Sequence, residues 1–212
     1  MKILALGDSF TYGSELADIK QAWPYLLANK LSGTVVNQGK AGCSNEVVVD
    51  NLVSSDISQF DLVVILWTHF DRFEICDDVD QFTHWPGGRR KDHREVATYR
   101  PLIIDYWNYH HNDKYLYRQY LKTIVLTQSY LVSHGKRFVM ADAFGNHKDP
   151  GRYDKNNQDL IDQIDKSNFL GWPNESTLEW VGDVPVGPQQ HYLDQGHQIV
   201  AERFYQHLTN QS

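Results

Sequence analysis

The sequence predicts a three-layer α/β fold with a parallel sheet, in a single domain that spans residues 1–212. Short apolar runs of strand length recur along the chain, and segments with the spacing of amphipathic helices separate them. This alternation continues from one end of the chain to the other, without a linker, an internal repeat or a low-complexity tract. A chain of 212 residues also has the usual length of one domain.

The predicted strands are continuous apolar runs rich in β-branched residues or leucine. Such runs are typical of parallel strands that helices cover on both faces. They are KILAL at 2–6, TVVN at 34–37, DLVVILW at 61–67 and RFVMAD at 137–142.

Four segments between or after these strands have apolar residues on one helical face. They cover 22–31, 44–55, 112–136 and 194–208. Ser32-Gly33 ends the first helix, Ser44 or Asn45 caps the second, and Gly135 stops the third.

The stretch from about Cys76 to Asn112 is too long for an ordinary connection, so we expect an insertion here, a lid in one interpretation. Its aromatic residues would suit stacking against a sugar or covering an acyl pocket, although packing is the commoner role of such residues. Its histidines His84, His93, His110 and His111 lack the spacing of metal ligands, so we predict no metal site and no cofactor.

The composition restricts the classes of partner. A formal net charge of −7 argues against nucleic acid or an anionic membrane. The first apolar run, Ile3 to Leu6, is too short for a signal peptide, and no run is long enough to cross a membrane. Two cysteines exclude a disulfide framework. We therefore expect a soluble, cytoplasmic protein that acts on a small molecule or carbohydrate, with the oligomeric state left open.

Ligands of parallel sheets bind beyond the carboxyl ends of the strands, and the first strand is followed by GDSFTYG, residues 7–13. Gly7 permits a tight turn, Asp8 can accept backbone N–H bonds, and Ser9 lies where a helix would begin. A turn with helix-capping residues would explain the tripeptide equally well.

ALGDSFTYG resembles the first conserved block of the SGNH, or GDSL, hydrolase superfamily, whose members are esterases, lipases and carbohydrate deacetylases with a flavodoxin-like fold. The resemblance implies that Ser9 is the nucleophile and that its backbone N–H is part of the oxyanion hole. VVNQGKAGCSNE is similar to the second block and implies that Gly42 N–H is another oxyanion donor. Gly42 would equally serve to open the turn into the next helix.

The third block of the family, Gly-x-Asn-Asp, is replaced here by LWTHFDRFE. Alignment from the strand end puts His69 where the oxyanion asparagine would stand, and a shift of one residue selects Thr68. An imidazole N–H or a hydroxyl can donate to an oxyanion. Both residues would otherwise only cap the following turn. Arg72 in the same stretch would lie near the site or pair with Asp71 or Glu74.

Two histidines compete for the role of base near the C-terminus. The family's Asp-x-x-His is matched literally by Asp194 and His197. However, His197 shares a helical turn with residues that face the core, whereas His191 precedes the helix in a loop with Gly and Pro. The resemblance also aligns His191 with the catalytic histidine, so we predict His191 as the base and Asp194 as a helix N-cap.

This choice leaves the acid of the triad unassigned, because Pro188 stands three residues before His191. Asp183 is our candidate, and a backbone carbonyl or a Ser-His dyad would be alternatives. The resemblance thus implies a serine esterase of the SGNH type that cleaves a small, acetyl-like ester of a small molecule or carbohydrate. A binding protein that has lost catalysis and an acyltransferase remain the alternatives.

Overall fold

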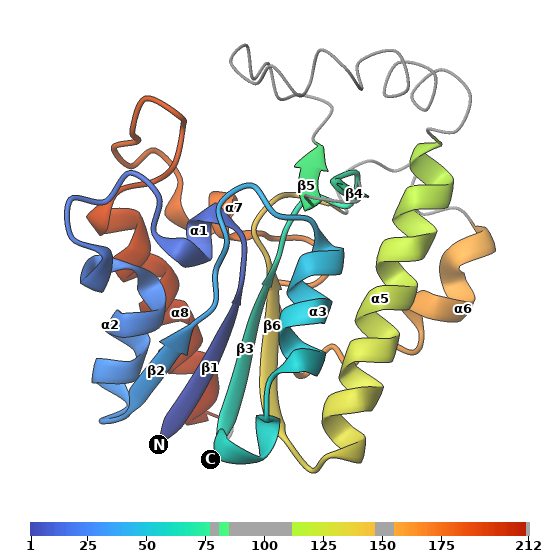
Figure 1. The fold of residues 1–212 in the computed structure, drawn as a ribbon, viewed down its shortest axis with the longest axis horizontal. Helices are drawn as coiled ribbons and strands as arrows, with labels where there is room; N and C mark the ends of the chain where they lie inside the picture. The colour runs from blue at the N-terminus through green and yellow to red at the C-terminus, as the bar shows by residue number, and fades with distance from the viewer. Residues whose placement is uncertain (77–80, 85–111, 147–154, 211–212) are drawn as a thin grey trace.

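A computed structural model describes residues 1–76, 81–84, 112–146 and 155–210. It contains a five-stranded parallel sheet with the order β2-β1-β3-β6-β7 (Figure 1). The strands are β1 Lys2–Gly7, β2 Thr34–Asn37, β3 Leu62–Trp67, β6 Arg137–Asp142 and β7 Phe169–Leu170. The first four confirm the predicted strands. The fifth has only two residues, too few to leave a sequence pattern.

The register of the sheet determines which loops are neighbours. Gly7 at the end of β1 pairs with Leu66 in β3, and Trp67 at the end of β3 pairs with Asp142 in β6. The loops that follow these three strands therefore leave the same edge of the sheet. The strand order is that of flavodoxin-like folds, in which ligands bind at this edge.

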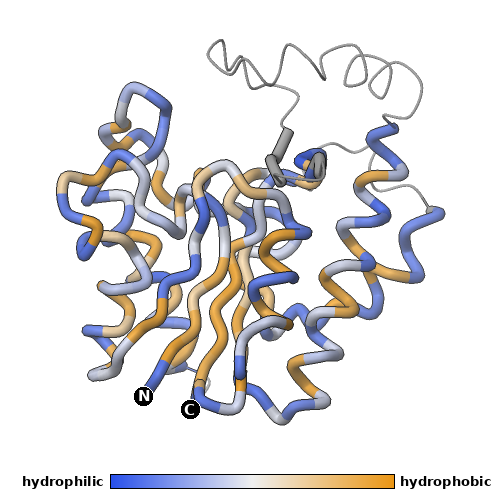
Figure 2. The backbone as a smooth tube through the Cα atoms, viewed as in Figure 1, coloured by the Kyte–Doolittle hydropathy of each residue, from blue (hydrophilic) through white to orange (hydrophobic). Residues whose placement is uncertain are grey.

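Helices cover both faces of the sheet and give the predicted three layers (Figure 1). α3 (Asn45–Ser54) and α5 (Asp113–Ser133) pack on one face, and α2 (Trp23–Lys30), α7 (Thr177–Val181) and α8 (Asp194–Asn210) pack on the other. Successive strand residues alternate between the two cores, as Leu4 and Ala5 do. The three central strands β1, β3 and β6 are accordingly apolar over most of their length (Figure 2).

Shorter elements connect the layers. They are α1 Ser9–Tyr12, η1 Ile19–Gln21, η2 Ile57–Gln59, η3 Lys155–Asn157, α6 Gln158–Ile161 and the antiparallel pair β4 Phe73–Cys76 and β5 Gln81–His84. Most of the predicted insertion at 76–112 lies outside the described residues. Its interpretation as a lid therefore stays a prediction.

The helix ends follow local sequence signals with one difference. Ser44 caps α3 by accepting a hydrogen bond from Val47 N–H, as predicted. The predicted N-cap Asp194 is instead the first residue of α8, because His197 N–H donates to the carbonyl of Leu193. An acid in the first turn still stabilises the positive end of the helix dipole. None of the helices in the described part of the chain is long and apolar enough to span a membrane.

Candidate active site

Ser9 is the first residue of α1, which starts directly after β1. The turn requires Gly7, because its φ is +154° and a Cβ there would lie 2.2 Å from Thr11 Oγ1. Asp8 Oδ1 accepts a hydrogen bond from Phe10 N–H at 3.0 Å and so caps the helix. Ser9 is thereby fixed at a helix N-terminus on the carboxyl edge of the sheet, where a developing negative charge is favoured.

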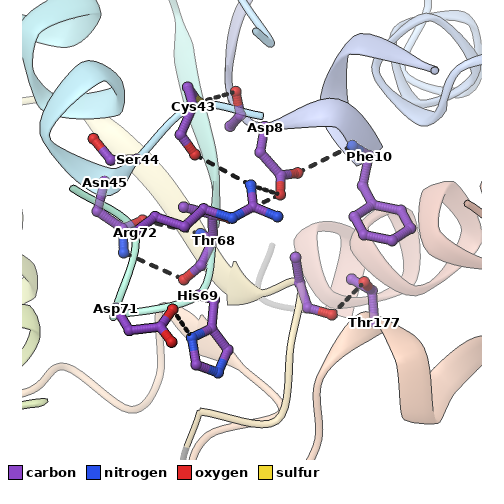
Figure 3. Close-up of polar contacts among 12 residues, drawn as sticks. Asp8, Phe10, Cys43, Ser44, Asn45, Thr68, His69, Asp71, Arg72 and Thr177 are labelled. Carbon is purple, nitrogen blue, oxygen red and sulfur yellow. Dashed lines mark hydrogen bonds and ion pairs between the residues drawn. The ribbon is translucent and has the colours of Figure 1, made fainter. Parts of the chain in front are cut away.

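The second oxygen of Asp8 joins the loops after β1 and β3. Asp8 Oδ2 accepts hydrogen bonds from Thr68 Oγ1 at 2.8 Å and from Arg72 Nη1 at 2.9 Å (Figure 3). All three residues are buried. The carboxylate partner described for Arg72 is thus Asp8, and not the neighbouring Asp71 or Glu74 that the sequence suggested. Because this ion pair is buried and hydrogen-bonded, it fixes the position of both loops.

Gly42 lies in the turn before α3 with φ +76°, a left-handed conformation that favours glycine. The turn closes through a hydrogen bond from Cys43 N–H to the carbonyl of Lys40, and the Cys43 thiol donates to the carbonyl of Gly7 at 3.5 Å. Burial, assisted by the charge of Asp8, raises the pKa of Cys43 to about 12. The thiol therefore stays protonated, which leaves Ser9 as the candidate nucleophile in this part of the site.

The structure distinguishes Thr68 from His69. The Thr68 hydroxyl donates to Asp8, and its backbone is held by both ends of the Asn45 amide. The side chain of His69 is about 26% exposed, and its Nδ1 contacts the carboxylate of Asp71. Of the two side chains, only that of His69 is partly exposed and therefore accessible to a ligand. Thr68 supports Asp8.

His191 lies in the loop before α8, beside the helix that begins with Ser9. The ring of Phe10 packs edge-on against the imidazole at a centroid distance of 5.1 Å. His191 Nδ1 lies 2.8 Å from Glu15 Oε2. The predicted partner Asp183 is exposed. The prediction for Asp183 is therefore wrong, because Glu15, from the loop that follows α1, takes the position at Nδ1.

Glu15 was not predicted from the sequence, because the Asp-x-x-His pattern of the family places the acid just before the histidine. One signal was present: an acidic residue stands six positions after Ser9, close behind the Gly-Asp-Ser motif. Desolvation, the largest effect, would raise the pKa of the Glu15 carboxyl. Hydrogen bonds from Gln189 N–H and His191 outweigh it, and the net pKa is lowered. Glu15 is therefore an ionised neighbour of the imidazole at neutral pH.

His197 has a structural role. It is fully buried in α8, and its Nδ1 accepts a hydrogen bond from Trp23 N–H at 3.1 Å. Desolvation, with a smaller effect from His191, lowers the pKa of His197 to about 3. The imidazole therefore stays neutral with one nitrogen committed to α2, as expected for a core residue.

Metal ligation has no support among the residues that the structure describes, because they contain no group of three or more His, Cys, Asp or Glu side chains that could hold an ion. His93, His110 and His111, on which a metal hypothesis would rest, lie outside those residues.

The sheet order and the position of Gly-Asp-Ser directly after β1 are those expected from the resemblance to the SGNH hydrolases. The sequence matches no family model, and no curated protein matches it significantly. Solved structures, by contrast, are similar over nearly the whole chain. A carbohydrate esterase of family two from Clostridium thermocellum, in complex with cellohexaose, has a TM-score of 0.55 at 14% identity, covering 99% of this chain and 64% of that chain.

Two further structures extend this similarity. A member of the lipolytic G-D-S-L family from Veillonella parvula has a TM-score of 0.52 at 14% identity. The alignment covers 99% of this chain and 98% of the Veillonella chain. A two-domain esterase active on acetylated mannans has a TM-score of 0.53 at 17% identity; our chain covers 48% of its length. These similarities confirm the predicted fold.

Proposed function

We propose that the protein is a serine esterase of the SGNH type, with Ser9 as nucleophile and His191 as general base. The observation that carries the proposal is the position of His191. Its ring packs against the helix that starts at Ser9, and its Nδ1 is held by a carboxylate. This leaves Nε2 as the nitrogen that exchanges a proton with the serine.

In this mechanism Ser9 Oγ attacks the ester carbonyl while His191 Nε2 takes the hydroxyl proton. The tetrahedral intermediate collapses to an acyl-serine, and His191 returns the proton to the departing alcohol. Water, deprotonated by His191, then attacks the acyl-serine, releases the carboxylic acid and regenerates the serine. Each half-reaction needs one base and one oxyanion site, and no cofactor.

Three donors are proposed for the oxyanion: the backbone N–H groups of Ser9 and Gly42 and the imidazole of His69. The contact of His69 Nδ1 with the Asp71 carboxylate fixes the imidazole ring, and donation to the oxyanion requires that His69 Nε2 carry a proton. Thr68 and Asp8 do not contact the substrate in this proposal; their hydrogen bond fixes the loops on which these donors lie.

For the substrate we propose a small, acetyl-like ester of a small molecule or a carbohydrate. The support is analogy of fold, since one similar enzyme acts on acetylated mannans and another was solved with cellohexaose. Acyl transfer to an alcohol would use the same residues with the acceptor in place of water.

The test is hydrolysis of p-nitrophenyl acetate by folded protein. Ser9→Ala and His191→Ala should each reduce kcat by at least 10³-fold, since removing either member disables the pair. The matched control His197→Gln should keep most of the activity. Equal losses in the two histidine variants, or activity that survives Ser9→Ala, would refute the assignment.

A further inference from the structure

The carboxylate of Glu15 is held by three donors from the loop that carries His191. Its oxygens accept hydrogen bonds from Gln189 N–H at 2.9 Å and 3.1 Å, from His191 N–H at 3.3 Å and from His191 Nδ1 at 2.8 Å. The side chains of Glu15 and His191 are each only 13% exposed. A carboxylate that is largely shielded from water and bonded to the backbone as well as to the ring has a fixed position.

The backbone on both sides of this contact is adapted to it. Glu15 has φ +67°, and so does Gln190, which directly precedes His191. Non-glycine residues adopt this left-handed conformation rarely, and they do so mostly where the surroundings impose it. Gly187 has no room for a side chain, because a Cβ would lie 2.5 Å from Glu15 Cδ. The two loops are thus shaped to bring this carboxylate against this imidazole.

We infer that Glu15 is the positioning acid of the site, so that nucleophile and acid come from the segment after β1 and the histidine comes from the loop before α8. The inference rests on the proposed function of Ser9 and His191. Glu15 accepts the proton of His191 Nδ1, which keeps Nε2 unprotonated and turned away from the Glu15 carboxylate. It also stabilises the imidazolium that forms when Ser9 is deprotonated.

A purely mechanical role is the competing explanation, since the same bonds attach residues 187–191 to the rest of the fold. The two explanations differ in what they predict for the imidazole. A mechanical tie affects the folded fraction and the thermal midpoint. A positioning acid also determines the tautomer of His191 and the kcat of the molecules that remain folded.

The experiment compares Glu15→Gln and Glu15→Asp with the matched control Asp183→Asn, an exposed acid near the same loop. Activity on p-nitrophenyl acetate is normalised to folded protein. Glu15→Gln should lower kcat by on the order of 10³-fold with KM nearly unchanged, because Glu15 does not touch the substrate. Glu15→Asp should retain more activity than Glu15→Gln, and Asp183→Asn should match the wild type.

A second readout does not depend on turnover. Nitrogen-15 NMR of the neutral His191 imidazole, assigned with His191→Ala, should show the Nδ1–H tautomer in the wild type and a mixture in Glu15→Gln. An unchanged tautomer together with an unchanged kcat per folded molecule would overturn the inference. If the wild type does not hydrolyse esters but the tautomer still depends on Glu15, the proposed function fails and the positioning role stands.

Discussion

The buried imidazole of His197 should make the folded protein less stable at acid pH. The imidazole is fully buried, and it replaces the side-chain cap that α2 lacks, since Ala22 at the N-cap position offers no acceptor to Trp23 N–H. Protonation of Nδ1 would remove this acceptor and bury a charge. The folded-state pKa of about 3 lies below the unfolded value of 6.5, so the unfolded chain binds the proton more readily. Stability should therefore fall as the pH drops below about 6.5.

The size of the effect follows from linkage. Each pH unit between 6.5 and 3 costs ~1.4 kcal/mol, so the loss from His197 alone at pH 5 is ~2 kcal/mol relative to pH 7.5. Urea unfolding at the two pH values measures it. His197→Gln keeps an acceptor for Trp23 N–H but cannot be protonated. Between pH 7.5 and pH 5 its free energy of unfolding should therefore fall by ~2 kcal/mol less than that of the wild type. If the wild type and this variant show the same pH dependence of stability, the reasoning is refuted. His134→Gln, at an exposed position, is the control and should keep the pH dependence of the wild type.

Two further substitutions test the loops around the site. Arg72→Met should lower the free energy of unfolding, measured in urea, by about 3–5 kcal/mol, because it leaves the buried carboxylate of Asp8 without its cation. Adding Asp8→Asn should restore a large part of this lost stability. A loss below about 1 kcal/mol in Arg72→Met would contradict the role of the ion pair. Gly187→Ala should displace the Glu15 carboxylate and lower kcat by roughly 10–100-fold, whereas Pro188→Ala, at an exposed position, should not. Steady-state kinetics with both variants decide the second prediction.

The fold could be predicted from the sequence because its central strands are buried on both faces. The stretches 62–67 and 138–141 within the predicted runs are apolar throughout, and this pattern is visible without a structure. β7 left no signal, since a two-residue strand has no periodicity. The boundaries of the four predicted helices depended on local caps and were predicted to within a few residues, whereas the short helices α1, α6 and α7 were not among them.

The candidate site was predictable in part. Ser9 followed from a motif at a strand end, and the choice of His191 over His197 followed from the helical spacing that buries His197. The acid that we propose, Glu15, was missed for a physical reason. The contact between Glu15 and His191 joins residues 176 positions apart and depends on left-handed backbone at Glu15 and Gln190, which no local pattern of these residue types predicts.

The central claim is that Ser9 is a nucleophile activated by His191. Covalent labelling with a fluorophosphonate, mapped by tandem mass spectrometry, tests it most directly, because only an activated serine reacts rapidly. The expected result is a single adduct at Ser9 in the wild type, strongly reduced labelling in His191→Ala and near-normal labelling in His197→Gln. Folded wild-type protein that carries no adduct, or carries it at another residue, would contradict the claim.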